Sequence, residues 1–113
     1  MSRLEKIDGR TWRDFVQAPA AVLVIGKTDC PNCAAWAQEL EQFLEQDKDW
    51  QHVRFGKIYL DEGGLIDFKR ATPWLIDLDV LPFNQIYQNG ERTKGFPGGG
   101  IDRLVSRLRS LSS

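Results

Sequence analysis

Residues 20–36 read AAVLVIGKTDCPNCAAW, and this stretch decides the fold. Its first part, residues 20–25, is a continuous apolar run that ends at Gly26. An apolar run without alternation is typical of a central parallel strand that is covered on both faces. Cys30 and Cys33 follow a few residues later, where this buried strand gives way to the next element.

The residues after the cysteine pair have the periodicity of an amphipathic helix. Apolar side chains recur at spacings of three and four: Cys33, Trp36, Ala37, Leu40, Phe43 and Leu44. Acidic side chains occupy the other face: Glu39, Glu41, Glu45, Asp47 and Asp49. We therefore expect Cys30 at the start of a helix and Cys33 nearly one turn further in, on its buried face.

The rest of the chain predicts alternating strands and helices. Strands are expected at residues 4–7, 20–25, 53–60, 83–88 and 92–96, and helices after Thr11, after Cys30, around 65–70, after Pro73 and from Ile101. Thr11 and Asp14 have the spacing of a helix-capping pair, and Asn89-Gly90 is a hairpin signal. Strand–helix–strand units followed by a hairpin predict an α/β fold with a mixed sheet.

Composition sets the class of protein. The chain has 113 residues, and its 15 basic and 16 acidic side chains give a formal charge of −1. This length predicts a single domain, residues 1–113, that needs no disulfide staple or structural metal to fold. The near-neutral charge argues against nucleic-acid binding.

The N-terminus lacks the apolar stretch of a signal peptide, and no apolar run approaches the ~20 residues of a membrane span. We therefore expect a cytoplasmic protein with no membrane partner.

The spacing of the cysteines points to redox chemistry. Two cysteines placed at random in this chain would stand three apart only about 2 times in 100. In a reducing cytoplasm such a pair is more often catalytic or metal-binding than structural. Backbone N–H groups and the helix dipole at a helix start favour a thiolate on Cys30. Cys30 could then attack a substrate disulfide, and Cys33 could resolve the mixed disulfide.

Other interpretations of the pair remain open. The cysteines could be two small buried hydrophobes, or half of a site for zinc or another soft metal.

Two residues next to the cysteines affect their chemistry. Pro31 suits the first helical turn, where its missing N–H costs nothing. Asp29 could oppose the thiolate or cap the helix; we expect capping, with the pKa of Cys30 only moderately lowered.

Three features together resemble the thioredoxin family, over nearly the whole chain. The first is the apolar strand that leads into Cys30-Pro31-Asn32-Cys33 and a helix; the second is Leu81-Pro82 followed by a hairpin; the third is the strand KIYLD at residues 57–61. The resemblance implies a thioredoxin fold, with a central mixed β-sheet of four to five strands flanked by helices on both faces. It also implies a cis peptide bond before Pro82, which faces the cysteine pair, and a Leu81 backbone that binds an extended substrate.

The chain also departs from thioredoxins proper, which usually carry Trp-Cys-Gly-Pro-Cys. Asp29 precedes the first cysteine, and Pro31-Asn32 separates the two. Val24 stands where thioredoxins place a buried aspartate that helps to deprotonate the second cysteine. Lys57 is retained, either near the pair or as a strand-end lysine that reaches water. We expect Asp29, Pro31, Asn32 and Lys57 to tune the redox pair.

The predicted function is that of a thiol–disulfide oxidoreductase in cell redox homeostasis, with Cys30 as nucleophile and Cys33 as resolving cysteine. We expect reduction of protein disulfides, with no cofactor beyond the redox-active disulfide and no metal. An external donor, a reductase or a low-molecular-weight thiol, would supply electrons, since the chain has no motif for a flavin or nicotinamide. We expect a monomer. The alternatives are a thioredoxin-like peptide- or protein-binding module with vestigial redox activity, and a soft-metal carrier.

Overall fold

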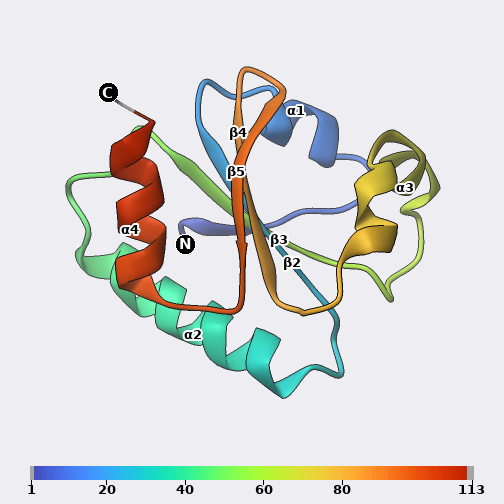
Figure 1. Cartoon of the computed structure of the whole chain (residues 1–113), viewed down its shortest axis with the longest axis horizontal. Helices are drawn as coiled ribbons and strands as arrows, with labels where there is room; N and C mark the ends of the chain where they lie inside the picture. The colour runs from blue at the N-terminus through green and yellow to red at the C-terminus, as the bar shows by residue number, and fades with distance from the viewer. Residues whose placement is uncertain (1, 112–113) are drawn as a thin grey trace.

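A five-stranded sheet forms the centre of this computed structural model, which describes residues 2–111 (Figure 1). The elements, in chain order, are β1 (Leu4–Lys6), α1 (Trp12–Val16), β2 (Ala21–Gly26), α2 (Pro31–Gln46), β3 (Arg54–Tyr59), α3 (Ile66–Ala71), the 3-10 helix η1 (Pro73–Asp77), β4 (Phe83–Gln88), β5 (Glu91–Pro97) and α4 (Ile101–Ser110).

The sheet has the strand order β1-β3-β2-β4-β5. β1, β3 and β2 are parallel, whereas β4 and β5 are antiparallel to their neighbours. The predicted mixed sheet is therefore confirmed. β2 lies at its centre, and every residue of β2 is buried. This position explains why the sequence of β2 shows no alternation of apolar and polar residues.

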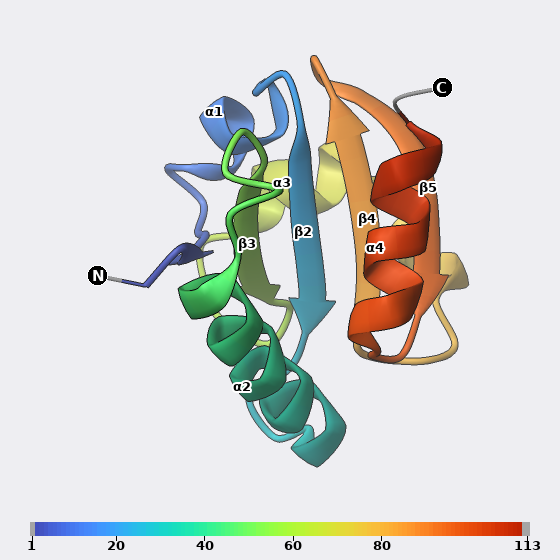
Figure 2. The same ribbon diagram turned by 90° about the vertical axis from the view of Figure 1, so that its left-hand side faces the viewer.

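Helices cover both faces of the sheet, so the core has two parts. Figure 2 shows α2 and α4 on one face, with α1 and α3 behind the other. On the first face Val24, Trp36 and Leu104 belong to one apolar cluster. On the second face Phe15 and Phe68 belong to another. The amphipathic pattern of α2 is confirmed, because its apolar stripe is the face that contacts the sheet.

The start of α1 differs from the prediction. Thr11 is the N-cap residue but makes no side-chain capping hydrogen bond. Instead the carboxylate of Asp8 accepts the backbone N–H groups of Arg10 at 2.9 Å and Thr11 at 3.1 Å. The carboxylate of Asp14 lies 3.0 Å from the Arg54 guanidinium on β3. The predicted Thr11–Asp14 capping pair is therefore wrong, because a tertiary ion pair takes Asp14 and an upstream aspartate caps the turn.

Residues 63–80 contain α3 and η1, which confirm the helices expected around residues 65–70 and after Pro73. Phe68 anchors α3, since its side chain is 1% exposed and its ring centre lies 5.5 Å from that of Trp12. By contrast, Ile76 and Val80 are exposed, at 88% and 52%. The segment thus packs through α3 and presents apolar side chains to solvent where the chain approaches β4. Within residues 2–111, no helix has both the length and the apolar character to cross a membrane.

Tyr87 on β4 should make the stability of the protein fall at high pH. Burial raises the pKa of its phenol to about 12, because the charged phenolate is disfavoured in the core. The unfolded chain has a pKa near 10, so above pH 10 it loses the proton while the native state keeps it. We expect the free energy of unfolding to fall by up to about 2.7 kcal/mol as the pH rises from about 10 to about 12.

Urea unfolding of wild type and Tyr87→Phe, at pH 9 and at pH 12, measures this effect. The variant should lose less stability than wild type over this interval. Tyr59→Phe, which changes a half-buried tyrosine on β3, is the matched control. Equal losses in wild type and Tyr87→Phe would show that the phenol does not contribute.

Candidate active site

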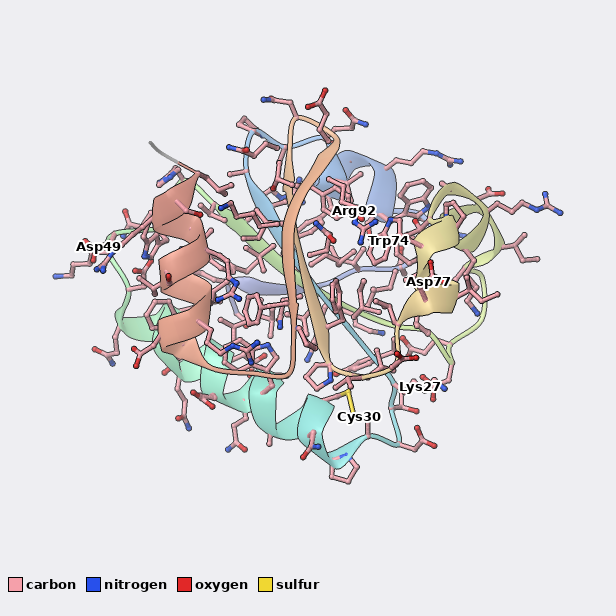
Figure 3. The ribbon with its side chains drawn as sticks, in the orientation of Figure 1. Lys27, Cys30, Asp49, Trp74, Asp77 and Arg92 are labelled. Atoms are coloured by element: carbon pink, nitrogen blue, oxygen red, sulfur yellow. A yellow bond between two sulfur atoms is a disulfide. The ribbon has the colours of Figure 1, made fainter. Side chains whose placement is uncertain are left out.

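The two cysteines lie at the N-terminal end of α2, just beyond the carboxyl end of β2. They form a disulfide, with their Cα atoms 5.2 Å apart. Figure 3 shows this bond in yellow below the sheet. Cys33 is 2% exposed, whereas Cys30 is partly exposed. The predicted asymmetry of the pair is confirmed: one sulfur is accessible and the other is shielded.

Local backbone features hold the pair in place. Cys30 is the N-cap of α2, and its Sγ accepts the backbone N–H of Cys33 at 3.1 Å. Pro31 occupies the first helical turn, as predicted. Gly26 ends β2 against the pair, since a Cβ there would lie 3.0 Å from Cys33 Sγ. After reduction, the Cys33 N–H and the start of the helix would stabilise a thiolate on Cys30.

Asp29 does not cap α2, so the predicted capping role is wrong. The cap is one residue later, where the sulfur of Cys30 already accepts the available N–H group. Asp29 is exposed beside the pair. The loop is instead clamped by Thr28, whose backbone N–H and hydroxyl both donate to the Asp61 carboxylate. The side-chain hydrogen bond from Thr28 holds the pKa of Asp61 below its usual value. We did not identify Thr28 or Asp61 from the sequence.

Leu81 and Pro82, which directly precede β4, lie beside the cysteine pair although they are distant from it in the sequence. The Leu81–Pro82 peptide bond is cis, as the resemblance implied. The carbonyl oxygen of Leu81 lies 4.0 Å from Cys30 Sγ. A groove of about 280 Å³ begins here, lined by Asn32 and Trp36 of α2, by residues 80–82 and by the loop 98–100. Partly exposed Cys30 therefore lies beside Leu81, which lines the groove and offers a main-chain acceptor.

Lys57 lies on β3 beside Val24, with which it is paired in register. Its Nζ is 4.0 Å from Glu41 Oε1 on α2 and 5.9 Å from the centre of the Tyr59 ring. Val24 is 4% exposed and belongs to the apolar cluster under α2. The ammonium group is thus directed to the Glu41 carboxylate and the Tyr59 ring. The role of Lys57 in tuning the pair stays a prediction.

A buried asparagine, which we did not identify from the sequence, joins α2 to the groove. Asn84 is fully buried on β4 and accepts the indole Nε1–H of Trp36 at 2.7 Å. Its amide nitrogen donates to the carbonyl oxygens of Phe96 at 3.2 Å and Gly98 at 2.7 Å. The signal in the sequence is an asparagine within a strand, where this residue type is depleted. The network connects the helix that carries the cysteines to the loop that closes the groove.

Metal ligands are sparse in the part of the chain that the structure describes. There, no three His, Cys, Asp or Glu side chains come together in a way that could hold a metal ion.

Asn32 is exposed on the first turn of α2. It lines the groove together with Pro82, so these two predicted site residues lie close together.

Comparison with known proteins gives structural matches only. No protein-family model matches the chain, and no curated protein sequence matches it. Thioredoxin f from spinach chloroplast (long form) is similar with a TM-score of 0.77 and 18% identity, over 97% of this chain and 87% of that one. A Malassezia sympodialis thioredoxin is similar with a TM-score of 0.77 and 15% identity, over 100% of this chain and 94% of that one.

A third similar structure is thioredoxin f2 in complex with ferredoxin:thioredoxin reductase. Its TM-score is 0.74 at 18% identity, and the match covers 97% of this chain and 96% of that one. At these identities the likeness shows the architecture. The mixed sheet, the helices on both faces and the cis bond before Pro82 are those that the resemblance in the sequence implied. The chain therefore has the thioredoxin fold.

Proposed function

We propose that this protein is a thiol–disulfide oxidoreductase that reduces disulfides in protein substrates. The main observation that supports this function is the asymmetric pair at the start of α2, where Cys30 is partly exposed and Cys33 is 2% exposed. The disulfide between them also favours redox chemistry over a binding module or a soft-metal carrier. Thioredoxins among the similar structures support the same activity.

The proposed cycle starts from the reduced pair. The Cys30 thiolate attacks one sulfur of a substrate disulfide, the substrate S–S bond breaks, and the first substrate thiolate leaves and takes a proton from solvent. Cys33 then loses its proton and attacks Cys30 Sγ, which breaks the mixed disulfide and releases the second substrate thiol. The substrate gains two electrons and two protons, and the Cys30–Cys33 disulfide forms.

Residues around the pair have assigned parts in this cycle. The Cys33 N–H, 3.1 Å from Cys30 Sγ, stabilises the attacking thiolate. Leu81 and Pro82 form the platform for an extended substrate, because the Leu81 carbonyl lies 4.0 Å from the same sulfur. The reduction potential of the pair is set by the residues next to it, which are Asp29, Pro31 and Asn32. Lys57 affects the redox potential of the pair at longer range, through Glu41 and Tyr59.

The oxidised pair needs an electron donor. A thioredoxin of the same fold forms a complex with ferredoxin:thioredoxin reductase, which supports a reductase as the donor here. A low-molecular-weight thiol is the other candidate. We further propose that residues 1–113 form one domain that acts as a cytoplasmic monomer without a cofactor. The near-neutral charge of the chain supports a protein partner over a nucleic acid.

Reduction of insulin by dithiothreitol, followed by turbidity, tests the activity. Wild type should accelerate precipitation, and the double variant Cys30→Ser/Cys33→Ser should match the reaction without protein. Equal rates for wild type and the double variant would contradict the proposal. The reduction potential gives the direction: a value below about −250 mV marks a reductant, whereas one near −120 mV marks an oxidant.

A further inference from the structure

We propose that Glu39 makes the groove beside the cysteine pair selective for protein substrates with a lysine or arginine a few residues from the reacting cysteine. This inference rests on the proposed function and specifies the substrate class of the same site. It starts from the groove itself. Glu39 is the one charged residue among the described residues that line this groove of about 280 Å³.

The carboxylate of Glu39 has no ion-pair partner in the part of the chain that the structure describes. Glu41, two residues away on α2, lies 4.0 Å from Lys57 Nζ. Glu39 is exposed and forms no ion pair with any residue in the range 2–111. The negative charge in the groove is therefore available to a bound partner.

Two cations in adjoining segments make contacts that do not involve Glu39, although Arg103 contacts Gly99 of the groove. Arg103 lies beside the loop 98–100, where its guanidinium donates to the Gly99 carbonyl at 3.3 Å and lies 4.9 Å from the centre of the Phe96 ring. Lys27 lies on the α3 side of the pair (Figure 3), and it lines a separate pocket together with Asp61. Acidic Asp29 and Asp79 adjoin Cys30 and Val80, which adds negative charge near the groove.

The spacing along α2 places the basic residue of the substrate. Cys30, which bonds to the substrate cysteine, and Glu39 are nine residues apart in the sequence, or about 13 Å at 1.5 Å per residue along α2. An extended chain advances about 3.3 Å per residue, so a substrate that lies along α2 reaches Glu39 about four residues from its cysteine. Ala35 lies between and is exposed, so its apolar surface suits the methylene stem of a lysine or arginine.

Peptides that contain one disulfide and differ at a single position test this inference. Each peptide carries Lys, Gln or Glu four residues from the cysteine, in one series on its N-terminal side and in another on its C-terminal side. We expect wild type to reduce the Lys peptide of one series with a kcat/KM about fivefold above that of the Gln peptide. The Glu peptide should be the poorest, and added salt should reduce the difference.

Variants at Glu39 separate its charge from other effects. Glu39→Gln should remove the preference, and Glu39→Lys should reverse it in favour of the Glu peptide. Glu45→Gln is the matched control, because Glu45 is also exposed on α2 but does not line the groove. Circular dichroism of each variant verifies that the fold is intact.

The outcomes distinguish the two proposals. If wild type reduces all peptides equally, the selectivity is wrong and the oxidoreductase activity stands. If Glu45→Gln removes the preference as fully as Glu39→Gln, a general charge effect replaces the assigned site, and the inference is overturned. If wild type reduces none of the peptides and fails with insulin as well, the proposed function falls together with its substrate class.

Discussion

A Cys33→Ser variant should stop turnover and accumulate a mixed disulfide between Cys30 and its substrate. Cys30 is the accessible sulfur, with the Cys33 N–H directed at it from 3.1 Å, so the first attack needs no help from the Cys33 side chain. The second step requires the Cys33 thiol, because a serine hydroxyl cannot displace the substrate thiol from Cys30. Activity in the insulin assay should fall to the rate measured without protein. The adduct should persist when the reduced variant meets the substrate disulfide without dithiothreitol.

Mass spectrometry of the non-reduced protein, after digestion, measures the adduct and locates it. Cys30→Ser is the matched control, and it should form no adduct, because the remaining Cys33 is 2% exposed. An adduct on Cys33 in the Cys30→Ser variant, at a yield equal to that on Cys30, would reverse the assigned roles. The same pair of variants shows which cysteine meets the substrate first.

Asn84→Ala should lower the free energy of unfolding by about 3–5 kcal/mol, since several buried polar groups lose their partners together. The substitution removes hydrogen bonds to Trp36 Nε1 and to the carbonyl oxygens of Phe96 and Gly98. Asn84 is 0% exposed, so water does not readily replace the lost amide. The change also leaves a cavity under α2.

Urea unfolding of the oxidised protein measures this loss. Gln42→Ala, an exposed substitution on α2, is the control and should change stability by less than about 0.5 kcal/mol. A loss below about 1 kcal/mol for Asn84→Ala would mean that the network does not hold α2 to the sheet. The loop 98–100 should also lose order, and hydrogen exchange at the Gly98 N–H, which donates to the Pro82 carbonyl at 2.7 Å, reports it.

Much of the fold was predictable because its strongest signals are local. The unbroken apolar run of β2, the spacing of apolar residues in α2 and Asn89-Gly90 each reflect burial or turn geometry over a few residues. Element boundaries agree within a few residues. Where an interaction was set by a distant partner, the prediction was wrong. Asp14 of α1 pairs with Arg54 on β3. The error at Asp29 is local instead, because Cys30 takes the capping position one residue later.

The sequence by itself determined the cysteine pair, its position at a helix start and its asymmetric burial, because these follow from the order of residues along one strand and one helix. Only the tertiary structure decided what surrounds the pair. It placed Leu81 beside Cys30 and joined Trp36 to Asn84. It also left Glu39 in the groove without an ion pair among the described residues, while Glu41 lies near Lys57. Those contacts join residues far apart in the chain, and no local periodicity encodes them.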